Sequence, residues 1–260
     1  MKSKVFLATA LMTVGFAVQV QAGELPRPVL NQNVFIPSSG FDDNDQIEFL
    51  LDGVLPNDCY TVLEPIIEVN RERKTISAVH RMQKKDNKLC LDESMLPSHM
   101  KFEVPVSVPV RMGKLAVGDY SIRAHMTAPV TFGIEKAKLD AQDDFNYANV
   151  TQAVVSPILF GKVSSKVVLK VQLPGDCVQL SDRVEVIRQG SVFVILPRIE
   201  AVLGNACTAA PSTVEKVIDL GMLDMGRYAV HVRASGGRAV QAAFSVIAPR
   251  DSLPPSEDDK

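Results

Sequence analysis

The chain has 260 residues, and its 30 acidic side chains slightly outnumber its 28 basic ones, for a net charge of −2 at neutral pH. A protein that binds phosphate backbones carries a basic stripe, whereas Lys and Arg are scattered here, so the composition argues against nucleic acid as a partner. The same balance argues against binding to an anionic membrane surface.

The N-terminus is typical of a secretory signal peptide. Lys2 and Lys4 precede an uncharged apolar stretch, Val5 to Val18, and Ala22 ends a small-residue cleavage site. The apolar stretch has about 14 residues, fewer than the ~20 that a helix needs to cross a bilayer. We therefore expect residues 1–22 to be removed on export, and the mature protein to be periplasmic or secreted, without membrane insertion.

A short N-terminal segment, 23–45, ends in a cluster of acidic residues, Asp42, Asp43 and Asp45. Hard oxygen ligands packed in a loop can hold Ca²⁺, although the spacing lacks the EF-hand pattern and its terminal Glu. A solvated turn held by Asx hydrogen bonds is the alternative. Calcium is thus one hypothesis for this cluster, and the sequence indicates no other cofactor.

Short alternating segments then predict a first β-sandwich domain over 46–138. The clearest is 101–111, where apolar and polar residues alternate without exception and Pro105 and Pro109 fall on the outward set. Because proline has no amide donor, we expect this segment to be an edge strand. The expected strands of this domain are 46–54, 61–70, 74–82, 101–111, 119–126 and 130–136.

The alternation stops over 139–163, an acidic and irregular stretch that we interpret as a linker. Its Asp140, Asp143 and Asp144 could form an interdomain metal site by the same reasoning as above. A second domain follows over 164–248, and the acidic residues 249–260 are expected to be a disordered tail. The expected strands of the second domain are 165–173, 178–188, 191–198, 214–220, 227–234 and 239–247.

An internal repeat relates the two domains. The matched segments are Leu55-Pro56-Asn57-Asp58-Cys59 with Leu173-Pro174-Gly175-Asp176-Cys177, Cys90 with Cys207, and Leu115-x-x-Gly118-x-Tyr120 with Leu223-x-x-Gly226-x-Tyr228. So many matches in one order predict two copies of one fold.

The four cysteines of an exported chain favour disulfides. Of the three ways to pair them, the repeat selects Cys59–Cys90 with Cys177–Cys207, because each copy then closes on itself. A zinc site is the alternative, but it would need further His or carboxylate ligands at suitable spacing near each pair.

The two Leu-x-x-Gly-x-Tyr segments resemble the tyrosine corner of immunoglobulin-like and fibronectin type III-like sandwiches, in which a buried Tyr hydroxyl bonds to nearby backbone. Tyr120 and Tyr228 would be those residues. With the Leu-Pro-x-Asp-Cys motif, the whole pattern is similar to domains of uncharacterised exported proteins and lipoproteins of Gram-negative bacteria. The resemblance implies an all-β fold of two tandem immunoglobulin-like antiparallel β-sandwich domains, each with one disulfide, and it brings no catalytic residues.

The sequence contains no recognisable catalytic motif, and a serine without a positioned base has no route to activation. The four histidines are His80, His99, His125 and His231, and the last two lie on the outward sets of their strands, where we expect them to be exposed.

We therefore predict a non-enzymatic envelope or secreted module that binds a protein or glycan through loops or an exposed edge, of unspecified oligomeric state. One alternative is a periplasmic chaperone that lends a strand to extracellular subunits, with Val130, Phe132 and Ile134 as an alternating donor face. Another is an enzyme of unfamiliar type, which a cleft with converging carboxylates or histidines would indicate.

Overall fold

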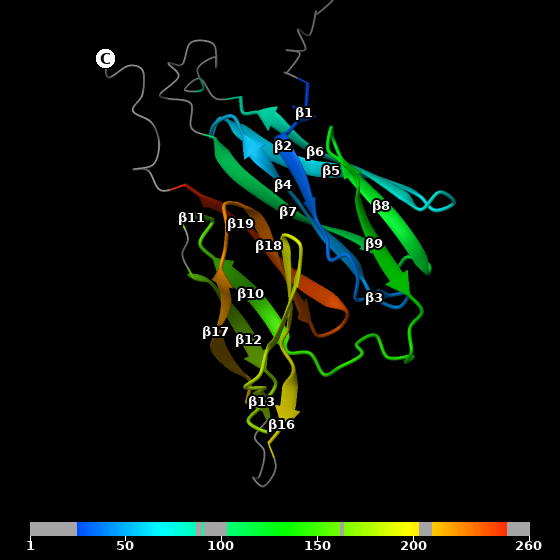
Figure 1. Ribbon diagram of the computed structural model, residues 1–260, viewed down its shortest axis with the longest axis vertical. Helices are drawn as coiled ribbons and strands as arrows, with labels where there is room; N and C mark the ends of the chain where they lie inside the picture. Colours follow the sequence, from blue (N-terminus) through cyan, green and yellow to red (C-terminus); the bar gives the residue numbers. More distant parts are fainter. Residues whose placement is uncertain (1–24, 87–89, 91–102, 162–163, 203–209, 249–260) are drawn as a thin grey trace, which may run out of the picture.

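A computed structural model describes residues 25–86, 90, 103–161, 164–202 and 210–248. Within these residues the chain is all-β, with no helix. The predicted signal peptide, 1–22, and the predicted tail, 249–260, lie outside the described residues. The chain forms two halves that pack against each other, as Figure 1 shows.

The first half consists of two facing sheets. Its strands are β1 (Arg27–Pro28), β2 (Leu30–Phe35), β3 (Phe41–Asp42), β4 (Ile47–Leu55), β5 (Tyr60–Asn70), β6 (Thr75–Lys84), β7 (Val104–Gly113), β8 (Gly118–Ala124) and β9 (Val130–Glu135). One sheet has the order β2-β4-β7, and the other has the order β1-β6-β8-β9-β3 with β5 paired to β6. Their inward side chains, such as Phe49 of β4 and Ile122 of β8, share one apolar core.

The second half repeats this arrangement. Its strands are β10 (Asn149–Val155), β11 (Ile158–Phe160), β12 (Ser164–Leu173), β13 (Val178–Leu180), β14 (Glu185–Gln189), β15 (Val192–Leu196), β16 (Ile199–Ala201), β17 (Ser212–Met222), β18 (Gly226–Ala234) and β19 (Arg238–Ile247). A sheet of order β10-β12-β17 faces one of order β11-β19-β18-β15-β14, and β13 pairs with β16. Leu169 of β12 and Val230 of β18 are fully buried between the sheets.

The prediction of purely antiparallel sheets is wrong. β6 runs parallel to β8 in the first half, and β15 runs parallel to β18 in the second. In the first half, β7 lies between β6 and β8 in sequence and belongs to the opposite sheet, so the chain reverses twice and returns in its original direction. The short strands β3 and β11 also pair in parallel, with β9 and β19.

Three boundaries differ from the prediction. The predicted linker, 139–163, contains β10, which pairs with β12, and the N-terminal segment, 23–45, contains β2, which pairs with β4. The predicted strand 178–188 is divided into β13 and β14, which join different sheets.

The predicted edge strand and one disulfide are confirmed. β7 ends its sheet, and Pro105 and Pro109 are exposed on its outward set. Cys59 and Cys90 form a disulfide with their Cα atoms 5.5 Å apart. This bond agrees with an oxidising compartment. The second predicted pairing, Cys177–Cys207, stays a prediction because Cys207 lies outside the described residues.

The two candidate corner tyrosines differ. The hydroxyl of Tyr228 donates a hydrogen bond of 3.0 Å to the backbone carbonyl of Asp224, as a tyrosine corner requires. Tyr120 is equally buried and stacks on Phe132, with 5.6 Å between ring centroids. However, no hydrogen bond joins its hydroxyl to the described residues.

Candidate binding cleft

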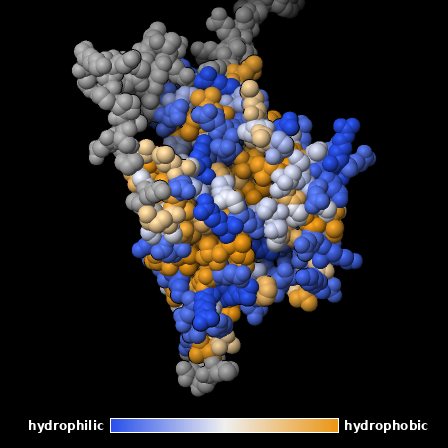
Figure 2. Space-filling view, viewed as in Figure 1, coloured by the Kyte–Doolittle hydropathy of each residue, from blue (hydrophilic) through white to orange (hydrophobic). Residues whose placement is uncertain are grey.

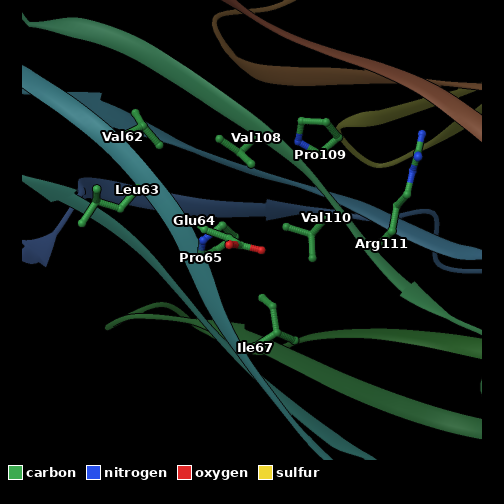
Figure 3. Close-up of a pocket in the computed structure, with 9 residues that line it drawn as sticks. All are labelled: Val62, Leu63, Glu64, Pro65, Ile67, Val108, Pro109, Val110 and Arg111. Atoms are coloured by element: carbon green, nitrogen blue, oxygen red, sulfur yellow. The ribbon is translucent and has the colours of Figure 1, made fainter.

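A cleft of about 660 Å³ opens on one side of the first half, between β5 and β7. These strands belong to opposite sheets, and no strand among the described residues pairs with their outer edges. Figure 3 shows the side chains that line the cleft: Val62, Leu63, Glu64, Pro65, Ile67, Val108, Pro109, Val110 and Arg111.

The walls of the cleft are the uncovered margin of the apolar core. Val62 and Ile67 of β5 pack against core clusters but are only partly buried. Val108 faces inward from β7 and is also partly buried. An apolar ligand that covers these side chains would gain about 25 cal/mol for each Å² removed from water.

Both strand edges beside the cleft are interrupted for main-chain pairing. Pro105 and Pro109 leave β7 without two of its amide donors, and in a paired strand these prolines must face the free edge. On β5 the register shifts between Leu63 and Ile66, which leaves Glu64 and Pro65 in a bulge. Such features block indiscriminate edge pairing, so a ligand would be held mainly by its side chains.

One carboxylate lies within this apolar surface. Figure 3 shows the side chain of Glu64 extending from β5 across the cleft toward Val110. It makes no ion pair or side-chain hydrogen bond with the described residues. Arg111 points out of the cleft, and its Nε lies 2.7 Å from Oε1 of Glu48. The cleft therefore offers a ligand one negative charge between apolar walls.

A second contact region joins the two halves. The outward side chains of β4 meet those of β18 through an ion pair between the buried Asp52 and the partly exposed Arg227. Nearby, Oδ1 of Asp45 lies 2.5 Å from Nη2 of Arg233, and Oε2 of Glu48 accepts a 3.0 Å hydrogen bond from the amide of Ala239. Apolar residues fill the centre of this contact: Phe35, Leu50, Val192, Val194 and Ala229.

Burial governs the titration of this contact. Desolvation raises the pKa of Asp45 above its usual value, although the neighbouring Arg233 guanidinium opposes this rise. Desolvation likewise raises the pKa of Asp52 against the opposing charge of Arg227. Burial thus disfavours the ionised form of both carboxylates, and the positive charges of their arginine partners offset that desolvation energy.

The expectation that His231 is exposed is wrong, because β18 is covered by the first half. His231 is only 3% exposed. Its Nδ1 lies 3.2 Å from the side-chain amide nitrogen of Gln241, and its ring lies edge-on to that of Phe41. Burial, together with the charge of Arg233, lowers the pKa of His231 to about 3. His125 is exposed as expected, and His99 lies outside the described residues.

His80 is enclosed in the core of the first half. It is fully buried, and neither ring nitrogen has a hydrogen-bond partner among the described residues. Burial lowers the pKa of His80 to about 4. Its ring is therefore neutral near pH 7, and no carboxylate or hydroxyl of the described residues is hydrogen-bonded to it.

The acidic cluster forms a turn. Oδ1 of Asp42 accepts the amide of Asn44 at 3.1 Å, which is an Asx turn, and Asp45 pairs with Arg233. Oδ1 of Asp43 accepts the amide of Ala137 at 2.9 Å. In the described part of the chain, no group of three or more His, Cys, Asp and Glu side chains is arranged to hold a metal. The geometry favours the turn, and calcium binding stays an untested hypothesis.

The acidic stretch between the halves is also engaged. The two carboxylate oxygens of Asp143 accept the amides of Gly236 and Gly237, each at 2.7 Å. The side chain of Asn44 donates to the carbonyls of Leu139 and Ala141. These bonds attach the connection to both halves, so Asp143 acts as a tether, and a metal site at Asp140, Asp143 and Asp144 stays a prediction.

Comparison with known proteins identifies no relative: no family model, no curated protein and no solved structure matches the chain significantly. Among the described residues, no helix is long and apolar enough to span a membrane.

Proposed function

We propose that this chain is a non-enzymatic exported binding protein that holds an extended segment of a partner protein of the cell envelope in the cleft between β5 and β7. The observation that carries this proposal is the Glu64 carboxylate, which has no ion-pair partner among the described residues and lies among partly buried valines, between two strand edges. The chain would use two immunoglobulin-related sandwich domains as its scaffold, in the periplasm or after secretion.

The shape and chemistry of the cleft suit a peptide. A side chain every second residue of an extended segment would face the apolar walls, as in other strand-shaped recognition sites. A Lys or Arg of that segment would pair with Glu64. Among the described residues, no aromatic ring lines the cleft as a platform for a sugar, which favours a protein over a glycan as the ligand.

A chaperone that lends a strand to its client is supported less well. Its expected donor face was Val130, Phe132 and Ile134 on β9. Phe132 and Ile134 are each 2% exposed and belong to the core of the first half, so lending them would open that core. The cleft is suited to receive a segment, which is the opposite role.

A photo-crosslinking residue tests where the partner binds. Placed at position 64 of the tagged mature protein, in envelope extract, it should give a discrete crosslinked product. Glu72, an exposed residue at the tip of the β5–β6 hairpin, provides the control position. Crosslinking of the same product from position 72 alone, or from neither position, would contradict the proposal.

A further inference from the structure

The outer face of the sheet β10-β12-β17 corresponds to the face of β2-β4-β7 that the second half covers. In the first half a register shift follows Ile47, and Glu48 then pairs with Arg111. In the second half the shift follows Ser165, and Lys166 then pairs with Asp219. Counting along the strands from these shifts, Val168 takes the place of Leu50 and Lys170 takes the place of Asp52.

The two faces differ in burial. Leu50 is 2% exposed beneath the second half. Its counterpart Val168 lies in register between Val154 and Val217, in a row across three strands. Val154 is 42% exposed and Val217 is 57% exposed. Figure 2 shows hydrophobic surface gathered over this part of the second half. An apolar row on a sheet face marks an interaction surface.

The outer face of β6 and β8 is the surface of the first half that corresponds to the contact face of the second half. Tyr120 of β8 pairs with Phe132 in the first half, as Tyr228 of β18 pairs with Phe244 in the second. This aligns β8 with β18, and Asp119, one residue before Tyr120, then corresponds to Arg227, one residue before Tyr228. Asp119 is exposed on the outer face of β8. Val79 of β6, on the same outer face, corresponds to Leu196 of β15. Val79 pairs in register with Ile66 of β5, and Ile66 is also exposed.

The ion pair between the two halves has a counterpart with exchanged signs on the two exposed faces, that of β10-β12-β17 and that of β6 and β8. Between the halves, Asp52 pairs with Arg227. At the corresponding positions stand Lys170 and Asp119, again of opposite sign but with the signs reversed. Lys170 is free to change partner, because its contact with Glu215 is a 3.9 Å ion pair between largely exposed side chains, which contributes little.

We propose that the free face of the second half, centred on Val154, Val168 and Val217, docks on the outer face of β6 and β8 in a second copy of this chain. Lys170 of one copy pairs with Asp119 of the next. The contact is heterologous, so each added copy leaves one face of each kind free and association continues head to tail. Polar residues such as Thr75 and Ser77 surround Val79, so the association is weak and sensitive to salt.

Analytical ultracentrifugation of the mature protein over a range of concentrations up to ~1 mM tests this contact. The weight-average mass should rise continuously with concentration, and less steeply at high salt. Lys170→Asp and Asp119→Lys should each lower the association constant at least ~10-fold, a loss of about 1.4 kcal/mol. The double variant should recover much of that loss because the pair is restored with exchanged signs.

Lys136→Asp, at an exposed site outside both faces, is the matched control and should associate like the parent chain. A mass that stays monomeric over the whole range would overturn the proposal. So would a closed dimer, or an association that ignores the two single variants while the variants keep the circular dichroism of the parent.

Discussion

The carboxylate of Asp45 lies 2.5 Å from the guanidinium of Arg233, and both side chains are almost completely buried where the two halves of the chain meet. Asp45 stands in the turn before β4, whereas Arg233 is on β18, 188 residues further along the chain. This ion pair therefore joins the two halves directly.

We expect Asp45→Asn to destabilise the protein by about 3 kcal/mol, because Arg233 would remain buried without a counter-charge. The double variant Asp45→Leu with Arg233→Met should recover most of that loss, since it removes both charges. Urea unfolding measures both effects. Glu185→Gln, which breaks an exposed pair with Arg198, is the control and should cost less than ~1 kcal/mol. Equal effects of Asp45→Asn and Glu185→Gln would contradict this account.

His80 should make stability depend on pH. Its pKa is about 4 in the folded chain and 6.5 when unfolded, so below pH 6.5 the unfolded chain takes up a proton that the folded chain excludes. Stability is therefore lost as pH falls from about 6.5 to about 4. The unfolding free energy of the parent chain should therefore change with pH in this window, and His80→Leu should reduce that change by ~1.4 kcal/mol per pH unit, which corresponds to about one proton.

Urea titrations at several pH values measure that slope. His231 should add a similar slope of its own, because its pKa is lowered to about 3, and this slope should persist in His80→Leu. His125→Leu, at an exposed site, is the control variant. An unchanged slope in His80→Leu would mean that the ring is not excluded from protonation.

The two buried tyrosines provide a matched pair. Tyr228→Phe should lower the free energy of unfolding by about 1 kcal/mol, because the carbonyl of Asp224 loses its bond from the Tyr228 hydroxyl. Tyr120→Phe should have a smaller effect, since the Tyr120 hydroxyl has no such bond to the described residues. Thermal unfolding of both variants decides this point, and a larger loss in Tyr120→Phe would refute the difference.

The disulfide closes a loop between residues 31 positions apart. On the chain-entropy account, replacing Cys59 and Cys90 together by Ser should cost about 3 to 4 kcal/mol. Comparing the denaturation midpoint of this variant with that of the oxidised parent measures the loss. A shift equivalent to less than ~1 kcal/mol would show that the closed loop contributes little.

Alternation and turn residues predicted most strands because each depends on local pattern. The run around Val106 and Val108 identified an edge strand, and the repeat identified the pairing of Cys59 with Cys90. β10 was missed because a register shift between Val150 and Gln152 breaks its alternation. The parallel pairing of β6 with β8 was missed because strand direction depends on connections that alternation does not report.

The contact between the halves and the cleft could not be predicted for a different reason. The alternation along β18 shows that His231 and Arg233 point away from the core of the second half. It does not show that the first half covers these side chains. The cleft likewise requires β5 and β7 to lie at the margins of opposite sheets, which only the tertiary structure shows. Glu64 carries no distinguishing sequence signal.

Peptide binding to the cleft tests the central claim most directly. Fluorescence anisotropy would compare an extended peptide whose cleft-facing positions are Val, Lys and Val with one whose cleft-facing positions are Val, Glu and Val, using the mature protein, Glu64→Lys and the control Glu72→Lys. We predict that the parent and Glu72→Lys bind the Lys peptide in preference, and that Glu64→Lys loses or reverses this preference. Binding of neither peptide, or the same preference in all three proteins, would contradict the account.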